Sequence, residues 1–279
     1  MTLRNLPELK HGRVPETCAF APDEDALERW NAGIRAEQAP ENTITILDVI
    51  GEDWWGEGVT SKRVAAALRQ IGDQEVFVDI NSPGGDFFEG VAIYNLLRTH
   101  KQKVTVRILG LAASAASVIA MAGDRIEIGK AGFMMVHNAW VVAIGNRHDM
   151  RELADTLDVF DDAMAGLYAE RADKDRKQAA RWMDDETWFN GESAVAKGLA
   201  DAFLSVDTEI DASASARAKT TNATRQVDAA LARQGIPRSE RRSLLGEIKG
   251  GTQDAAATAT HDAGDWLAAA RQLTETLRS

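Results

Sequence analysis

Cysteine is almost absent from this chain of 279 residues, which contains only Cys18. A single cysteine excludes an intramolecular disulfide and any cysteine-rich metal site, and it is typical of a reducing compartment. Basic charge is also scarce, because 32 Lys and Arg residues stand against 43 Asp and Glu residues, a formal net charge of −11. Such a surface repels a phosphate backbone, which argues against nucleic-acid binding.

Long apolar runs are missing as well. The longest, Gly110 to Gly123, contains two serines and is too short to cross a bilayer. Residues 1–16 have no apolar segment of the kind that a secretory signal needs. No GxxxxGK[ST] motif is present, so no ATPase is predicted in this chain. We therefore expect a cytoplasmic protein that has no membrane or nucleic-acid partner and needs no metal or other cofactor.

Composition divides the chain into three regions. Residues 1–40 are polar and weakly periodic, and they are interpreted as an N-terminal arm or a processed leader. Residues 41–205 alternate strand-like and helix-like patterns, which predicts an α/β domain with mostly parallel strands. Residues 206–279 are interpreted as a linker, including SASARAKTTNAT at 213–224, followed by a helical tail with segments at 239–249 and 265–277.

Within the central region, β-rich segments alternate with amphipathic ones. Thr60 is expected to cap a helix, and a second helix should place Phe88 and Leu96 near the core. A tight turn beginning at Gly110 should lead into a small-residue helix. Strands are predicted at 43–50, 75–80, 103–108, 125–128 and 133–137.

A long helix is predicted from about residue 149 to residue 172. Apolar residues recur along it at spacings of three and four, which gives it one apolar stripe. The sequence leaves open whether this stripe packs on its own domain or on another subunit. The stripe consists of Met150, Leu153, Leu157, Phe160, Met164 and Leu167.

Ser114 is the candidate nucleophile. It lies in Gly-Leu-Ala-Ala-Ser-Ala-Ala-Ser, where small neighbours leave its hydroxyl clear and allow a substrate backbone to approach. Upstream, a strand ends in Asn81-Ser-Pro-Gly-Gly85, whose glycines can turn backbone N–H groups into a site. His137 ends the apolar strand at 133–137 and is the best-placed histidine to serve as a base. Taken singly, each motif is also compatible with an ordinary turn, a packed helix or a structural histidine.

A carboxylate should orient the base. Asp184, Asp185 and Glu186 precede the apolar pair Trp188-Phe189, and a catalytic role, a solvated surface or capping of the helix predicted at 191–197 all fit them.

The joint order of these motifs resembles the ClpP peptidase family over about residues 44–204. The resemblance implies a ClpP/crotonase-like fold, with Ser114 as nucleophile, His137 as base, and the Gly85 and Ala115 N–H groups as oxyanion hole. Glu186 aligns with the family's acid, and Asp185, one residue earlier, is the alternative. The resemblance also implies ring-shaped homo-oligomers and no cofactor at the site.

Several whole segments are similar to a phage subgroup of this family, and these are Gly51–Gly58, Ala113–Gly123, His137–Trp140 and Glu186–Phe189. That similarity implies a prohead protease that trims capsid and scaffold proteins, and often itself, inside assembling procapsids in the bacterial cytoplasm. The tail would then contact capsid or scaffold. Three alternatives remain: a ClpP-like peptidase working with a host unfoldase, a crotonase-type acyl-CoA enzyme, and a non-catalytic assembly protein.

Overall fold

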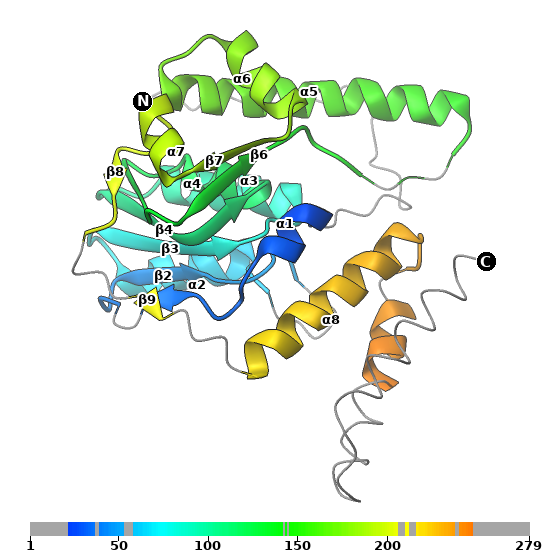
Figure 1. Ribbon diagram of the computed structural model, residues 1–279, viewed down its shortest axis with the longest axis horizontal. Helices are drawn as coiled ribbons and strands as arrows, with labels where there is room; N and C mark the ends of the chain where they lie inside the picture. Colours follow the sequence, from blue (N-terminus) through cyan, green and yellow to red (C-terminus); the bar gives the residue numbers. More distant parts are fainter. Residues whose placement is uncertain are drawn as a thin grey trace, which may run out of the picture.

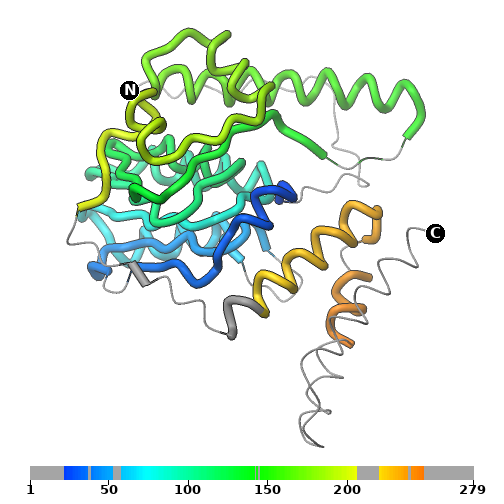
Figure 2. The backbone as a smooth tube through the Cα atoms, in the orientation of Figure 1, coloured from blue at the N-terminus to red at the C-terminus, as the bar shows by residue number. Residues whose placement is uncertain are grey.

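The computed structural model describes residues 22–36, 39–52, 58–141, 143, 145–205, 210–211, 216–237 and 240–247 (Figure 1, Figure 2). Most of the predicted arm, the segment at 53–57 and the predicted tail helix at 265–277 lie outside these residues. Within them, every helix is too short or too polar to cross a membrane.

A seven-stranded sheet forms the centre of the molecule (Figure 1). Six of its strands run parallel, and five of these follow one another in the order β2 (Thr43–Ile46), β3 (Val76–Ser82), β4 (Val104–Ala113), β5 (Arg125–Ile128) and β8 (Ala202–Phe203). Val78, Ile80, Val106 and Ile108 on the two middle strands are fully buried, as expected for strands covered on both faces. The predicted α/β fold with mostly parallel pairing is confirmed.

Strand β4 is shared between two sets of neighbours. Its first half, Thr105 to Ile108, pairs with β5, and its second half pairs with β6 (Phe133–Val136) through Leu111↔Phe133 and Ala113↔Met135. Strand β6 in turn pairs antiparallel with β7 (Thr187–Asn190). The prediction of a tight turn at Gly110 is wrong, because these residues continue the strand and the turn comes only after Ala113.

Helices connect the strands of the sheet and pack against it. They are α2 (Ser61–Ile71), α3 (Phe87–Arg98), α4 (Ala115–Ala120), α5 (Arg147–Ala172), α6 (Arg176–Asp184) and α7 (Gly191–Lys197). The Thr60 hydroxyl caps α2 as predicted, accepting a hydrogen bond from the Arg63 N–H. Helix α3 differs from the prediction: Ile93 and Leu97 face the core, whereas Phe88 is 41% exposed.

The two halves of the long helix α5 differ in how much of the apolar stripe is buried against the domain. Phe160 and Met164, in its C-terminal half, are buried against the domain. The N-terminal half projects past the body of the molecule (Figure 1), and there Met150 is 38% and Val159 36% exposed. The stripe therefore packs on its own domain over only part of its length.

The flanks fold onto the domain. Helix α1 (Glu24–Arg29) packs against α8 (Ala216–Arg233), and β1 (Arg35–Ala36) pairs antiparallel with β9 (Ile210–Asp211). The interpretation of residues 213–224 as a linker is wrong from residue 216 onward, because α8 begins there. Residues 240–247 are helical, within the predicted segment 239–249.

Candidate active site

Ser114 lies at the junction of β4 and α4. It is the residue before the first helical residue, and its backbone is at φ 54° and ψ −125°. A positive φ is uncommon for a residue with a side chain and costs free energy that the surrounding structure must supply. The Ser114 N–H donates to the Met135 carbonyl at 3.0 Å, which ties this bend to β6. The side chain does not cap α4, so the hydroxyl remains available to other partners.

His137 is the first residue after β6, and it meets Ser114 directly. The distance between His137 Nε2 and Ser114 Oγ is 2.6 Å, which is a short hydrogen bond. Strands β4 and β6 are paired up to Ala113 and Met135, and Ser114 and His137 follow one and two residues beyond this pair, so both leave the sheet at the same edge. The structure therefore brings together the two residues that the sequence singled out.

Burial changes the pKa of the His137 imidazole. His137 is only 6% exposed, and burial lowers its pKa below the ordinary value of 6.5 because the charged form loses hydration. The negative charge of Asp23, the residue before α1, acts in the opposite direction and raises this pKa. The lowered pKa keeps the ring neutral at pH 7, and a neutral ring nitrogen can accept the serine proton.

The Gly84-Gly85 turn lies against Ser114 on the other side. Gly84 has φ 90°, and a Cβ built there would lie 2.6 Å from the Ala113 oxygen and 2.8 Å from Ser114 Cβ. Gly85 has φ 144°, and a Cβ there would lie 2.2 Å from the Ile50 oxygen. Only glycine fits this close approach of three backbone segments.

Two backbone N–H groups near Ser114 remain outside the regular pairing. The bridge between Ile50 and the turn uses the Gly84 carbonyl and the Asp86 N–H, so the Gly85 N–H takes no part in it. Ala115 is the first residue of α4, and the N–H groups of a first helical turn have no acceptor within the helix. The Gly85 and Ala115 N–H groups are therefore left out of the regular pairing of the sheet and the helix, and their role as oxyanion donors stays a prediction.

Sequence reasoning did not find the support beneath the serine. The buried Ser117 hydroxyl bonds to the Ser114 carbonyl at 2.7 Å and to the Tyr168 hydroxyl of α5 at 2.8 Å. Burial raises the pKa of Tyr168, so its hydroxyl stays protonated. Ser117 was visible in the sequence three residues after Ser114, but nothing in the pattern connected it with Tyr168.

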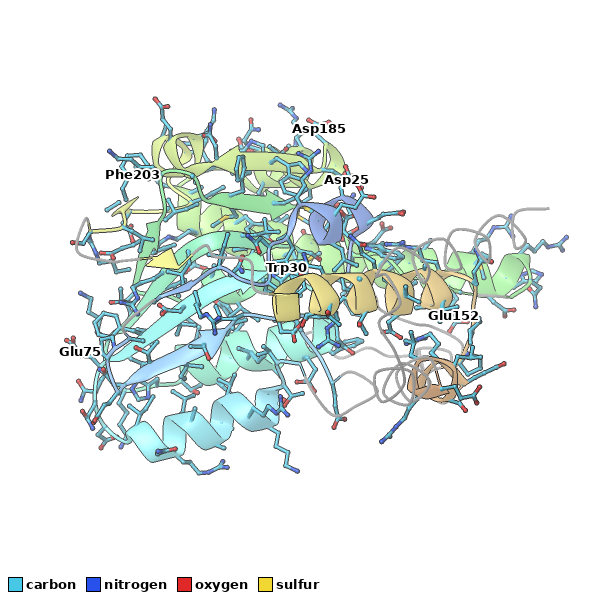
Figure 3. The ribbon with its side chains drawn as sticks, turned by 60° about the horizontal axis from the view of Figure 1, so that its bottom comes forward. Asp25, Trp30, Glu75, Glu152, Asp185 and Phe203 are labelled. Carbon is cyan, nitrogen blue, oxygen red and sulfur yellow. The ribbon has the colours of Figure 1, made fainter. Side chains whose placement is uncertain are left out.

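The predicted acids Asp185 and Glu186 directly precede β7, the strand paired with β6, but neither contacts the His137 imidazole. Among the described residues, Ser114 is the one hydrogen-bond partner of the His137 side chain, and Glu186 and Asp185 are both exposed. Figure 3 shows Asp185 at the surface. Asp184 accepts a hydrogen bond from the Asn138 side chain at 2.9 Å, which fastens the loop after His137 to α6.

The described residues contain no group of three or more His, Cys, Asp or Glu side chains arranged to hold a metal ion. That no cofactor takes part stays a prediction.

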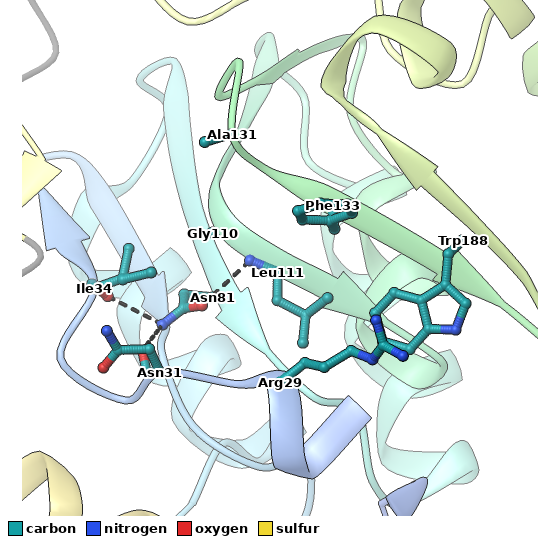
Figure 4. A pocket seen from close by; sticks show the side chains of 9 residues that line it. All are labelled: Arg29, Asn31, Ile34, Asn81, Gly110, Leu111, Ala131, Phe133 and Trp188. Atoms are coloured by element: carbon teal, nitrogen blue, oxygen red, sulfur yellow. Dashed lines mark hydrogen bonds between the residues drawn. The ribbon is translucent and has the colours of Figure 1, made fainter. Parts of the chain in front are cut away.

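A separate cavity of about 250 Å³ lies between α1, β4, β6 and β7 (Figure 4). Leu111 and Phe133 form its floor, and the Arg29 guanidinium lies over the Trp188 ring at 4.7 Å along its edge. Neither Ser114 nor His137 lines it.

Comparison with known proteins identifies the family. Residues 54–207, more than half of the chain, match the family model for Clp protease. The chain belongs to this family. A Clp protease proteolytic subunit from Leuconostoc citreum is 30% identical over 141 residues, which is 49% of this chain and 70% of the relative. The corresponding subunit 3 from Streptomyces coelicolor is also 30% identical, over 60% of this chain and 77% of the relative. Both relatives are described as ATP-dependent.

Membership decides between the enzyme classes considered from sequence. Clp proteases are serine peptidases, so the chain is a hydrolase of peptide bonds, which favours this class over an acyl-CoA enzyme. Proteins of this family also form ring-shaped homo-oligomers. The match to the Leuconostoc citreum subunit covers 49% of this chain but 70% of the relative, so a larger share of this chain lies outside the match. Helices α1 and α8 both lie outside residues 54–207.

Proposed function

We propose that Ser114 is the nucleophile of this peptidase and His137 its general base. The observation that carries the proposal is the 2.6 Å separation of Ser114 Oγ and His137 Nε2. His137 takes the hydroxyl proton while Oγ attacks the scissile carbonyl, and the oxyanion is stabilised by the Gly85 and Ala115 N–H groups. His137 then protonates the leaving amine, and water hydrolyses the acyl-enzyme.

Glu186 is proposed as the acid that orients His137. The register of the β6–β7 pair supports this residue over Asp185, because Val136 pairs with Thr187. The pairing ends at Val136 and Thr187, and continuing the same antiparallel register by one step would bring Glu186 opposite His137. A change of side-chain rotamer in the exposed Glu186 would then be needed to reach the imidazole.

A fluorophosphonate probe tests the nucleophile. Peptide mapping should find the label on Ser114, and Ser114→Ala should abolish both labelling and peptide hydrolysis. Ser193→Ala is the control, since the Ser193 hydroxyl bonds to the Asn190 carbonyl, away from Ser114, and its loss should leave Ser114 reactive. Labelling of Ser114→Ala at the parent rate would exclude this assignment.

The biological role that we propose is head maturation in a tailed bacteriophage. The substrates would be capsid and scaffold proteins, cleaved within procapsids in the host cytoplasm. Support comes from the segments His137–Trp140 and Glu186–Phe189, which are similar to the phage subgroup, and from the long flanks outside the family match. The flanks give the chain additional surface for an assembling shell.

Co-expression with the capsid protein of the same genome tests this role. The parent should shorten the capsid or scaffold protein, and Ser114→Ala should leave both at full length. Equal trimming by the two proteins would instead favour a non-catalytic assembly protein.

A second candidate is a peptidase driven by a host unfoldase. The description of the relatives as ATP-dependent favours it, and the absence of a GxxxxGK[ST] motif means that ATP hydrolysis would have to come from a partner. ATP-dependent degradation of a folded substrate on addition of a host unfoldase would support this candidate. Capsid trimming without any unfoldase would support head maturation.

A further inference from the structure

Helix α8 lies outside the region matched by the family model and still reaches the catalytic end of the sheet. It runs beside α1 and the chain that follows β2, with Trp30 close to its first turns (Figure 3). Two of its polar side chains contact separate segments: Asn222 contacts the chain at Trp30 and Ala32, and Arg225 contacts Asp48. Each of these segments in turn contacts the end of β3 or the turn at Gly84 and Gly85.

The first connection is an ion pair. Arg225 is 6% exposed, and its Nε and Nη2 donate to the two oxygens of Asp48 at 3.0 and 2.7 Å. A planar guanidinium that binds both oxygens fixes the orientation of the carboxylate as well as its position. The same Asp48 carboxylate accepts a hydrogen bond from the Val49 N–H at 2.7 Å. Arg225 therefore holds the backbone at Asp48 and Val49.

The backbone at Ile50 in turn holds the turn beside Ser114. The Ile50 N–H donates to the Gly84 carbonyl at 2.8 Å, and the Ile50 carbonyl accepts from the Asp86 N–H at 3.0 Å. The contact at Gly85 is so close that a Cβ there would lie 2.2 Å from the Ile50 oxygen. A displacement of Val49 and Ile50 would therefore move the Gly85 N–H.

The second connection reaches the other end of the turn. The Asn222 amide donates to the Trp30 carbonyl at 2.5 Å and accepts from the Ala32 N–H at 3.3 Å. The Trp30 indole donates to the Asn81 carbonyl at 3.0 Å, and the Asn81 amide donates to the Asn31 carbonyl at 2.8 Å (Figure 4). Asn81 is the penultimate residue of β3, which leads into the turn at Gly84 and Gly85, so the strand before the turn and the segment that holds Gly85 are both linked to α8.

We propose that α8 positions the oxyanion turn, with Arg225 as the main positioning residue and Asn222 as the second. The inference rests on the proposed oxyanion role of the Gly85 N–H. Transition-state stabilisation depends on placing such a donor within a few tenths of an ångström, whereas substrate binding depends on it much less. Loss of the Arg225 contact should accordingly lower kcat and leave KM nearly unchanged.

The test measures peptide hydrolysis and fluorophosphonate acylation of Ser114 in the full-length chain. Arg225→Gln should lower kcat and the acylation rate by about tenfold or more, part of the 10²–10³-fold effect of losing an oxyanion donor. Arg225→Lys keeps the charge without the two-point contact and should recover part of the rate. Asn222→Ala provides a second variant should Arg225→Gln not fold, and melting curves report the folded fraction.

Arg241→Gln is the matched control. Arg241 bonds to Asp228 of α8 at 2.9 Å, and its side chain is 12% exposed, but this pair does not touch the segments that lead to the turn. Its acylation rate should stay within about twofold of the parent rate. An equal loss of acylation rate in Arg241→Gln would show that α8 only stabilises the fold, and it would overturn the inference.

Two further outcomes separate this inference from the proposed function. If the parent is labelled at Ser114 and folded Arg225→Gln and Asn222→Ala react at the parent rate, the inference alone is wrong. If the parent is not labelled at Ser114, the proposed function fails and the inference fails with it.

Discussion

At the scale of single residues, the separation of Ser114 and His137 follows from strand register. Each residue stands directly after one of two paired strands, β4 and β6, and their side chains meet at 2.6 Å. The left-handed backbone of Ser114 directs its hydroxyl away from the helix end that it would otherwise cap. The pair is therefore held by the sheet itself and needs no ligand to assemble it.

The pH dependence of the reaction should report the buried imidazole. His137 must be neutral to accept a proton, so activity is lost as pH falls through its pKa. Burial lowers that pKa, and the acid limb of kcat/KM should therefore lie below pH 6.5. A pH profile of peptide hydrolysis measures it, and an acid limb above pH 6.5 would contradict the burial argument.

Asp23→Asn should move this acid limb further down the pH scale. Removal of the Asp23 charge removes a contribution that raises the His137 pKa, whereas asparagine still caps α1 in the way that Asp23 does for the Ala26 N–H. Asp25→Asn, an exposed carboxylate on the same helix, is the control and should leave the profile in place. Identical profiles for the parent and Asp23→Asn would exclude an effect of this charge.

Glu186→Gln should separate the two candidate acids. If Glu186 orients the imidazole, its loss should lower kcat by about 10²–10⁴-fold with KM little changed. Asp185→Asn, one residue earlier and equally exposed, should behave like the parent. Steady-state peptide hydrolysis distinguishes them, and the reverse ranking would transfer the role to Asp185.

At the scale of elements, the turn after β3 and the bend after β4 are built to touch. Gly84→Ala should slow acylation of Ser114 by at least about 100-fold, because the added Cβ would lie 2.8 Å from Ser114 Cβ and force the two segments apart. Gly72→Ala is the control, since Gly72 also has a positive φ (70°) but no atom within 4 Å of its Cβ position. That variant should cost about 1–3 kcal/mol of stability and keep its activity. Equal acylation rates in both variants would exclude a close-packing requirement.

Local signals predicted several regular elements. The strand at 125–128 alternates in burial, the strand at 133–137 was predicted as an apolar run, and the cap at Thr60 was predicted from its residue type before a helical pattern. The path from Gly110 to Ala113 was not, because glycine and alanine fit a strand or a helix, and pairing with β6 decided it. In α3 the sequence pattern placed Phe88 inside, whereas packing against α4 buries Gly90 and Ile93 instead.

In the candidate active site, too, residues in local motifs were predicted and long-range contacts were missed. Ser114 and His137 were predicted because each stands in a local motif with a defined position in the chain. The charge of Asp23 and the Ser117–Tyr168 bond were missed, since they join segments that no local pattern connects. Helix α8 escaped notice because it packs through alanines and through two polar side chains, Asn222 and Arg225, without an apolar stripe.

At the scale of the whole molecule, the uncovered half of α5 is the surface that we expect to form ring contacts. Aspartate at Met150 and Val159 would place charge on this apolar surface and beside the helix's own carboxylates, so Met150→Asp with Val159→Asp should shift the oligomer toward smaller species. Light scattering after size-exclusion chromatography measures the mass. Leu244→Asp, at an apolar residue that is 39% exposed elsewhere, should keep the parent's mass. An unchanged mass in the double variant would place the ring contacts outside this surface.

The bond between Asn222 and Trp30 joins residues 192 positions apart, and a ribosome delivers them in order. At 5–20 residues per second, about 10 to 40 s pass between the emergence of one and the other. In the last part of that interval, after His137 has been made, a nascent chain carries both its serine and its histidine, but the helix that would steady the neighbouring turn has not been made. On the inference about α8, full reactivity would therefore arrive only after this helix has been made, and a shorter nascent chain would react slowly.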